Sequence, residues 1–223
     1  MALTVSNIME RARERYNAVG DDFFTDQMLR ALIFSAQEEL AKEGWVIEET
    51  YTTTSTDGTR ELAYPDNTLA IKEVRYDYEK IRKVPLRNDP KTSSTDPEGE
   101  PREYAVWNDI IILYPTPDTT GDTIQIRVYK YPSDITSNVS PLEVPQEYRD
   151  DLINYCVAHM ALKDQNIPLY REYISEWKMT VEKAKEQRAR RLRSDRPAKV
   201  RDEYFGSDFP TSDQEIVYGG FRF

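Results

Sequence analysis

The sequence predicts an α+β protein in which helices from both ends of the chain flank a small antiparallel β-sheet or barrel. Apolar residues recur at helical spacing before residue 44 and again between residues 144 and 184. The stretch between them is rich in β-branched and aromatic residues that alternate with polar ones. After Pro197 the periodicity stops, which indicates an extended tail.

These changes of pattern divide the chain into four parts. We expect N-terminal helices of a bundle in residues 1–44 and an antiparallel β domain in residues 45–132. A C-terminal two-helix hairpin of the same bundle is predicted over residues 141–196, followed by an extended arm over residues 197–223. We find no internal repeat.

Two helices are predicted at the N-terminal end. Ile8, Ala12 and Tyr16 share one stripe of a short first helix. Thr25 is a suitable N-cap for a second helix, because its hydroxyl can accept a backbone N–H of the first turn. Gly44 is expected to end that helix, since glycine adopts the left-handed conformation at low cost.

The β region contains two turn signals. Asp57-Gly58 predicts a hairpin between residues 46–54 and 60–64. Asn108-Asp109 predicts a tight hairpin between residues 104–107 and 110–114. Further strands are expected over residues 69–78, 81–86 and 123–129, and the polar residues 88–101 are expected to form an exposed loop.

Prolines mark the start of the C-terminal hairpin. Pro141 and Pro145 predict a helix that begins near Val144. The sequence Asn166-Ile167-Pro168 predicts a one-residue hinge, after which Pro168 opens a second long helix. The apolar stripes of the two helices have matching spacings, so an antiparallel pair is expected. These stripes comprise Tyr148, Leu152, Tyr155, Cys156 and Met160, then Tyr170, Tyr173, Ile174, Trp177, Val181 and Ala184.

The last predicted helix becomes basic at its C-terminal end. Seven cations, Lys183, Lys185, Arg188, Arg190, Arg191, Arg193 and Arg196, form a candidate docking patch. Cations at a helix C-terminus also offset the helix dipole, which is a purely structural role. A sharper interpretation is electrostatic docking onto an acidic partner, such as a sister subunit. Nucleic-acid contact ranks third, because no aromatic residues are interleaved with the arginines.

Side chains for catalysis are scarce. Cys156 and His159 could meet across one helical turn, but a buried apolar cysteine beside a partly buried histidine is the favoured interpretation. The pair Asp150-Asp151 sits at a helix start, where acidic residues are common. We find no nucleophile elbow, phosphate-binding glycine motif or Cys/His metal spacing. We therefore expect no catalytic residue, no bound metal and no cofactor, with an enzyme that uses a dispersed acid site as the third alternative.

Composition further restricts the kind of protein this can be. The net charge of -10 argues against a simple nucleic-acid coat. A single cysteine excludes an internal disulfide framework and suits a reducing compartment. No apolar run approaches the ~20 residues of a membrane helix, and the first residues do not read as a signal peptide. We expect a soluble protein made in the cytosol, with no membrane partner.

The final residues carry scattered aromatics, which is unusual for a disordered tail. We expect this arm to dock on a partner through six of them: Tyr204, Phe205, Phe209, Tyr218, Phe221 and Phe223.

The order of parts resembles phage head-to-tail adaptor proteins, the connector or head-completion group that includes tail tubular protein A of short-tailed phages. The resemblance covers residues 25–193. It depends on Glu43-Gly44-Trp45 leading from a helix into the sheet and on residues 126–132 closing that sheet. It depends also on residues 142–149 entering a helical pair with Tyr170, Tyr173 and Trp177.

This resemblance implies a structural virion protein rather than an enzyme. Such proteins form a ring, commonly dodecameric, between the portal and the tail nozzle or tail tube, and the ring extends the DNA channel. The implied partners are the portal protein, the tail protein, other copies of the chain, and DNA that passes without sequence-specific binding. The alternative is a DNA-binding or DNA-processing accessory protein that uses the basic residues 183–196.

Overall fold

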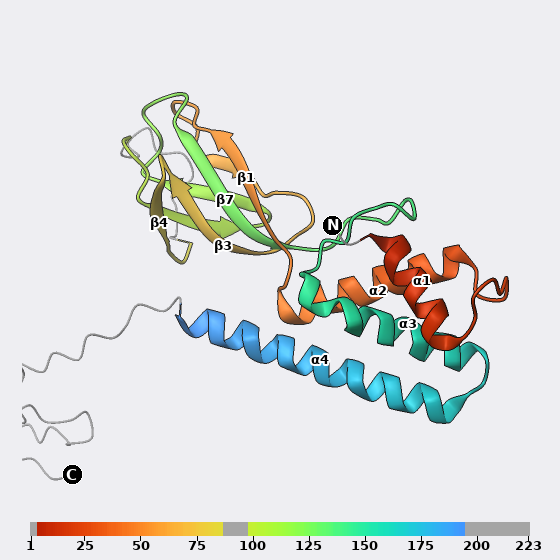
Figure 1. The fold of residues 1–223 in the computed structure, drawn as a ribbon. Helices are drawn as coiled ribbons and strands as arrows, with labels where there is room; N and C mark the ends of the chain where they lie inside the picture. The colour runs from red at the N-terminus through yellow and green to blue at the C-terminus, as the bar shows by residue number, and fades with distance from the viewer. Residues whose placement is uncertain (1–3, 87–97, 195–223) are drawn as a thin grey trace, which may run out of the picture.

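The computed structural model describes residues 4–86 and 98–194, and within them the protein has the predicted mixed α+β class. Four α-helices form a bundle and seven strands form one curled sheet beside it (Figure 1). The side chains of Arg193 and Ser194, at the end of the last helix, are not described.

The bundle consists of α1 (Val5–Tyr16), α2 (Asp26–Gly44), α3 (Arg149–Lys163) and α4 (Ile167–Ser194). Helix α3 contacts all three other helices, and α4 packs along both α2 and α3. Their apolar stripes meet in a core that excludes water; among its largest fully buried side chains are Trp177, Leu152, Ile33 and Leu40. The predicted stripe residues Ile8 and Ala12 are buried there too.

Helix α2 begins and ends where predicted. The Thr25 hydroxyl accepts the backbone N–H of Met28 at 3.3 Å. The helix ends at Gly44, but the left-handed residue is Trp45, with φ 52°. A Cβ atom added at Gly44 would lie 2.6 Å from the Cβ of Ala184. Gly44 therefore ends the helix as predicted and also permits close approach of α2 and α4, while the left-handed conformation falls on the next residue, Trp45.

The predicted limits of the C-terminal helices also need correction. The chain first forms a short 3₁₀ helix, η1 (Gln146–Tyr148), so α3 begins later than Val144. The two long helices are joined by residues 164–166 rather than by a one-residue hinge. Reversal of direction requires a left-handed residue, which is Gln165 with φ 60°. The side chain of Asn166 then caps α4 by accepting the N–H of Leu169 at 3.3 Å.

The sheet has the strand order β1-β7-β3-β4-β5-β6-β2. Its strands are β1 (Glu48–Thr54), β2 (Glu61–Ala63), β3 (Thr68–Tyr76), β4 (Glu79–Lys83), β5 (Glu103–Trp107), β6 (Ile110–Tyr114) and β7 (Thr123–Lys130). The inner face of the curl holds a second apolar core, which includes Val74, Ile81, Leu113, Ile124 and Val128.

The predicted hairpin of residues 46–54 and 60–64 is wrong. Strand β1 pairs with β7, whereas β2 pairs with β6 at the opposite edge of the sheet. Asp57-Gly58 still forms a tight turn, in which the N–H of Thr59 donates to the carbonyl of Thr56 at 3.0 Å. The turn is a local property, whereas the pairing of β1 with β7 and of β2 with β6 joins residues far apart in the chain.

The sheet is also not wholly antiparallel, because β4 and β5 pair in parallel at two positions. A parallel pair needs a long connection, and residues 84–102 supply one. The C-terminal end of the predicted exposed loop contacts the sheet, since Gly99 donates to the carbonyl of Thr116 at 2.8 Å. The rest of that loop, residues 87–97, lies outside the described residues. The predicted hairpin of β5 and β6 is confirmed, with left-handed Asn108 and Asp109 at its turn.

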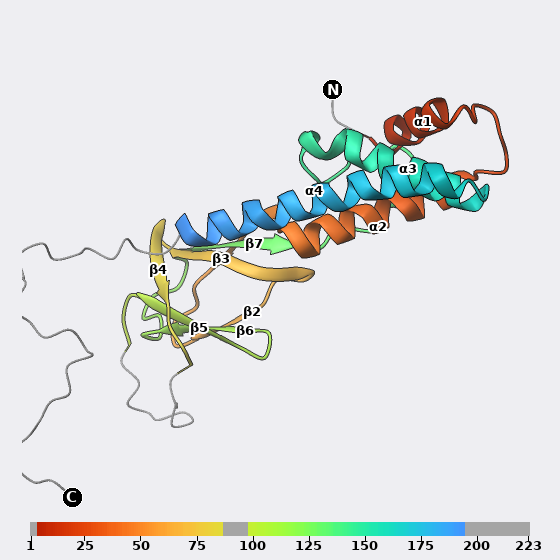
Figure 2. The ribbon, with the colours of Figure 1, turned by 90° about the horizontal axis from the view of Figure 1, so that it is seen from below.

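Helix α4 links the two parts of the molecule. It begins at the far end of the bundle and ends beside β3 and β4, as both views show (Figures 1 and 2). Its basic end therefore lies against the sheet, where Arg191 is 3.9 Å from a carboxylate oxygen of Glu48.

Candidate functional site

The basic end of α4 is divided between two faces of the helix. Lys185, Arg188 and Arg191 lie at intervals of three residues, so they share one face. That face contacts the end of α2 and the start of β1. Lys183 and Arg190, seven residues apart, share another face and are exposed to solvent.

The first face makes specific contacts with the protein itself. Lys185 is 3.5 Å from a carboxylate oxygen of Glu43 and 2.9 Å from one of Glu182. The hydrogen bond that Lys185 donates to Glu182, together with the charges of Glu182 and Glu43, outweighs desolvation and raises the pKa of Lys185. Arg188 donates to the backbone carbonyl of Glu43 at 3.3 Å. These contacts join α4 to α2, so part of the predicted docking patch has a structural role.

Aromatic rings extend this junction into the sheet. The Cζ atom of Arg188 lies 3.8 Å from the centre of the Trp45 ring, and that ring lies 5.1 Å from the ring of Tyr129 on β7. Lys72 of β3 lies 5.6 Å from the centre of the Tyr129 ring and 2.7 Å from Glu48. Because Arg188, Tyr129 and Lys72 come from α4, β7 and β3, and Trp45 from the connection between α2 and β1, the helix end and the sheet form one connected surface.

A second set of cations surrounds Glu73 on β3, and the sequence analysis did not identify it. Arg75 and Arg127 lie 2.8 Å and 2.9 Å from one Glu73 oxygen, and Lys80 lies 3.6 Å from the other. Burial alone would raise the pKa of Glu73, but the hydrogen bond from Arg75 and the surrounding cations outweigh it and hold the pKa below its ordinary value. Glu73 is therefore a charged, nearly buried centre that aligns three cations.

A hollow of about 420 Å³ opens beside this cluster, between β3 and β4. Its lining combines the apolar or aromatic residues Ile71, Ile81 and Tyr104 with the charged residues Lys72, Glu73, Lys80, Arg82 and Lys83. Burial, and then the nearby Glu73 carboxylate, raise the pKa of Tyr104 to about 12, so its hydroxyl stays protonated. Cations outnumber carboxylates in this lining, which suits an acidic partner.

The alternation of the strand residues could have revealed this cluster. Charged residues 73 and 75 alternate with buried apolar residues on β3, and residues 80 and 82 flank the buried Ile81 on β4. Such alternation places the charges on one face of the sheet. It does not show that Arg127, on β7, joins them, because that depends on the register of Glu73 opposite Arg127.

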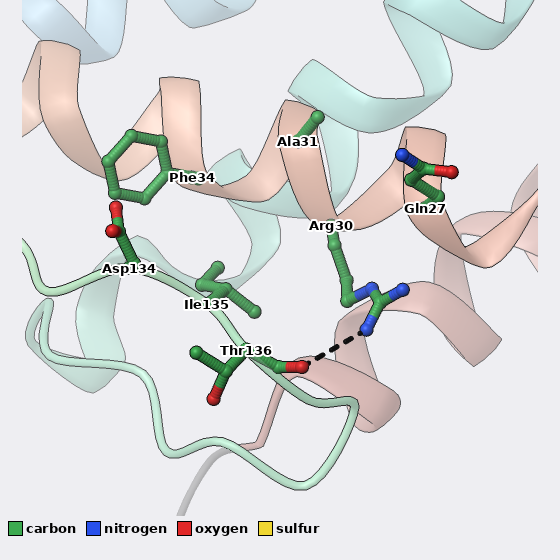
Figure 3. Close-up of a pocket in the computed structure, with 7 residues that line it drawn as sticks. All are labelled: Gln27, Arg30, Ala31, Phe34, Asp134, Ile135 and Thr136. Atoms are coloured by element: carbon green, nitrogen blue, oxygen red, sulfur yellow. Dashed lines mark hydrogen bonds between the residues drawn. The ribbon is translucent and has the colours of Figure 1, made fainter.

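A second hollow, also about 420 Å³, lies on the outer face of α2 (Figure 3). Phe34 and Ile135 form its apolar part, and Arg30 donates to the backbone carbonyl of Thr136 at 3.3 Å across it. Its lining contains no histidine or cysteine, and the guanidinium of Arg30 already donates a hydrogen bond to the backbone.

Cys156 and His159 do not have the properties of a catalytic pair. Cys156 is fully buried, and burial raises the pKa of its thiol to about 12, so the reactive thiolate is not formed at neutral pH. His159 packs instead against Tyr155, with ring centres 4.4 Å apart, and burial lowers its pKa. Asp151 of the predicted acid pair accepts the hydroxyl of Thr180 at 2.6 Å, which is a helix-packing contact.

No group of three or more His, Cys, Asp or Glu side chains among the described residues is placed to hold a metal ion. No helix among them combines the length and apolar character needed to cross a membrane.

Several predicted docking residues lie outside the described part of the chain. Arg196 follows its last residue, and Arg193 belongs to α4 without a described side chain. The aromatic residues of the arm all lie beyond it: Tyr204, Phe205, Phe209, Tyr218, Phe221 and Phe223. Their docking role stays a prediction.

Comparison with known proteins identifies a family. The family model described as SU10 adaptor protein matches residues 3–201 of the chain, which includes all four helices and the whole sheet. No curated protein matches.

Proposed function

The chain belongs to the SU10 adaptor protein family, and from this membership we propose that it is a head-to-tail adaptor that forms a ring between the portal and the tail of a phage particle. The family match across residues 3–201 carries the proposal, since it covers both the bundle and the sheet. The protein is thus a structural adaptor of the virion. The ring, its dodecameric number and its place on the DNA channel belong to the proposal.

The shape of the molecule supports a spacer role. Helix α4 has 28 residues and so measures about 42 Å, at about 1.5 Å per residue. It reaches from the outer end of the bundle to the sheet, as Figure 2 shows. The contacts of Arg188 with Trp45 and of Gly44 with Ala184 hold the sheet and bundle together. A rigid unit with surfaces at two ends can connect two different partners.

The outer end of the bundle carries exposed apolar side chains. Val19 and Phe23, on the connection between α1 and α2, are 74% and 50% exposed. Leu162 and Ile167 flank the connection between α3 and α4 at the same end of the bundle and are also exposed (Figures 1 and 2). Apolar residues gathered at one place on a surface are typical of a contact with another protein. We propose that this end contacts a neighbouring copy or the portal.

Overall charge supports the passage of DNA through the ring. The net charge is -10, and many of the described cations are engaged in ion pairs. Like charge disfavours binding of DNA phosphates, so an acidic lumen lets DNA slide without sequence-specific contacts. In this proposal the tail nozzle or tube docks on the opposite side from the portal.

The alternative, DNA binding through residues 183–196, is not favoured. Lys185, Arg188 and Arg191 contact Glu43, Trp45 and Glu48, so those cations are not presented together to a phosphate backbone. The family match also points to an adaptor. The alternative predicts DNA retention that falls steeply with salt and is lost when Arg188, Arg190, Arg191 and Arg193 are changed to Gln.

The decisive experiment mixes this protein with assembled portal from the same source. Light scattering would give the mass of the product, and negative-stain images would give its shape and copy number. A stoichiometric ring stacked on the portal is expected. Absence of association with a properly assembled portal would contradict the proposal, and retention on DNA in the same buffer would then favour the alternative.

A further inference from the structure

The hollow between β3 and β4 exists because these two strands separate. Their pairing covers residues 74–76 of β3 and 79–81 of β4. Beyond Ile81, β4 turns away and pairs with β5 through Arg82 and Lys83. Among the described residues, the first part of β3, residues 68–73, therefore pairs with β7 alone. It presents a strand edge to the hollow, and such an edge can accept another extended segment.

The chemistry of the hollow selects what can bind. Ile71 is half-buried and offers an apolar surface for an aromatic ring, and the buried Ile81 and Tyr104 also line the hollow. Lys80 and Lys83 are exposed beside them and offer positive charge. The Glu73 carboxylate is already held by Arg75 and Arg127, so it does not cancel all of that charge. An extended segment that combines aromatic rings with carboxylates fits both features.

The chain itself contains such a segment. Residues 202–209 read Asp-Glu-Tyr-Phe-Gly-Ser-Asp-Phe, with three carboxylates, three aromatic rings and no cation. The described part of α4 ends beside the sheet, where Arg191 lies 3.9 Å from Glu48. Only residues 195–201 intervene, and seven extended residues span up to about 23 Å.

We propose that residues 202–209 bind along the β3 edge of the hollow in the same molecule. The segment adds as a short strand beside residues 68–73, its aromatic rings pack on the half-buried Ile71, and its carboxylates lie near Lys80 and Lys83. This inference is independent of the ring. It also leaves Tyr218, Phe221 and Phe223 further along the arm for a separate partner.

Hydrogen exchange of the full chain tests the proposal. We expect the backbone amides of residues 202–209 to exchange about tenfold or more slowly than in an unstructured peptide, because strand pairing protects them. The variant Lys80→Glu with Lys83→Glu should abolish this protection. Lys178→Glu with Lys183→Glu makes the same change of charge on exposed positions of α4 and should leave it intact.

Two outcomes would overturn the proposal. One is exchange of residues 202–209 at the unstructured rate in the unmodified chain. The other is equal loss of protection in both charge variants, which would show a general effect of net charge. Circular dichroism spectra of both variants would confirm that the fold is retained before the amides are compared.

Cross-linking separates binding within one molecule from exchange between copies. The natural Cys156 is fully buried, so Ser207→Cys and Glu79→Cys supply the reactive thiols. A short bis-maleimide should join them within one chain at high dilution, whereas Ser207→Cys with Lys178→Cys should not be joined. Cross-linked dimers alone would overturn binding within the same molecule.

Discussion

Arg188 lies face-on to Trp45, with its Cζ atom 3.8 Å from the centre of the indole ring. The contact joins the last helix to the residue that ends the second helix and leads into the sheet. Trp45 holds a left-handed backbone conformation with φ 52°, and its ring also lies 5.1 Å from the ring of Tyr129 on β7. The relative placement of bundle and sheet therefore depends on these two side chains.

Removal of either side chain should loosen that junction. Trp45→Ala should lower the free energy of unfolding by about 2–4 kcal/mol, because it removes a large partly buried ring. Arg188→Ala should cost about 1 kcal/mol through loss of the cation–π contact. Urea unfolding followed by far-ultraviolet circular dichroism would measure both. Arg190→Ala, on the exposed face, is the matched control, and an equal effect there would contradict a specific role for Arg188.

Gly44 should tolerate no larger side chain. Gly44→Ala places a Cβ atom 2.6 Å from the Cβ of Ala184, and the resulting shift of α2 against α4 should cost about 1–3 kcal/mol. Combining it with Ala184→Gly should recover part of that loss, because the clash is removed. Thermal unfolding of the two single variants and the double variant would show the coupling. A Gly44→Ala protein with unchanged stability would contradict the close contact.

Glu73 should make the stability of the sheet sensitive to pH. Its pKa is lower in the folded protein than its ordinary value of 4.5, so its contribution is present above that value and is lost as the pH falls through the folded pKa. Near neutral pH, Glu73→Gln should cost about 2–4 kcal/mol, since it leaves Arg75 and Arg127 without their shared carboxylate.

Comparison of the two proteins at about pH 3 and at neutral pH isolates the charge of Glu73. The difference in unfolding free energy between wild type and Glu73→Gln should shrink in acid. Glu79→Gln, exposed on β4, is the control and should change little at either pH. A difference that stays constant with pH would indicate a packing effect instead.

Cys156 should be unreactive in the folded protein. The thiol is fully buried and its pKa is raised to about 12, so a thiol reagent at pH 8 should modify it only after unfolding. The reaction measured with and without guanidinium would test this, and His159→Ala should leave the native rate unchanged. Rapid modification of the native protein that depends on His159 would support a catalytic pair of Cys156 and His159.

Deletion of residues 197–223 should impair docking on the portal but leave the fold intact, because the described cores lie within residues 4–86 and 98–194. Co-sedimentation with portal would measure docking, and circular dichroism would measure folding. Replacement of Tyr218, Phe221 and Phe223 by Ala in the full chain tests the aromatic residues of the arm more specifically. Unchanged docking by the truncated protein would contradict the anchoring role of the arm.

The sequence alone determined the features that depend on neighbouring residues. Thr25 caps α2 because its hydroxyl meets an N–H three residues away. Asn108 and Asp109 form the turn of β5 and β6 because both adopt positive φ readily. The buried stripes that include Trp177, Val181 and Ala184 followed from helical periodicity.

Only the tertiary structure decided which distant segments meet. Asp57-Gly58 makes its turn, yet β1 and β2 go to opposite edges of the sheet, where β1 pairs with β7 and β2 pairs with β6. The ion pair of Glu73 with Arg127 and the cation–π contact of Trp45 with Arg188 also join residues far apart in the chain. Local sequence specifies turns, caps and faces, whereas long-range packing selects their partners.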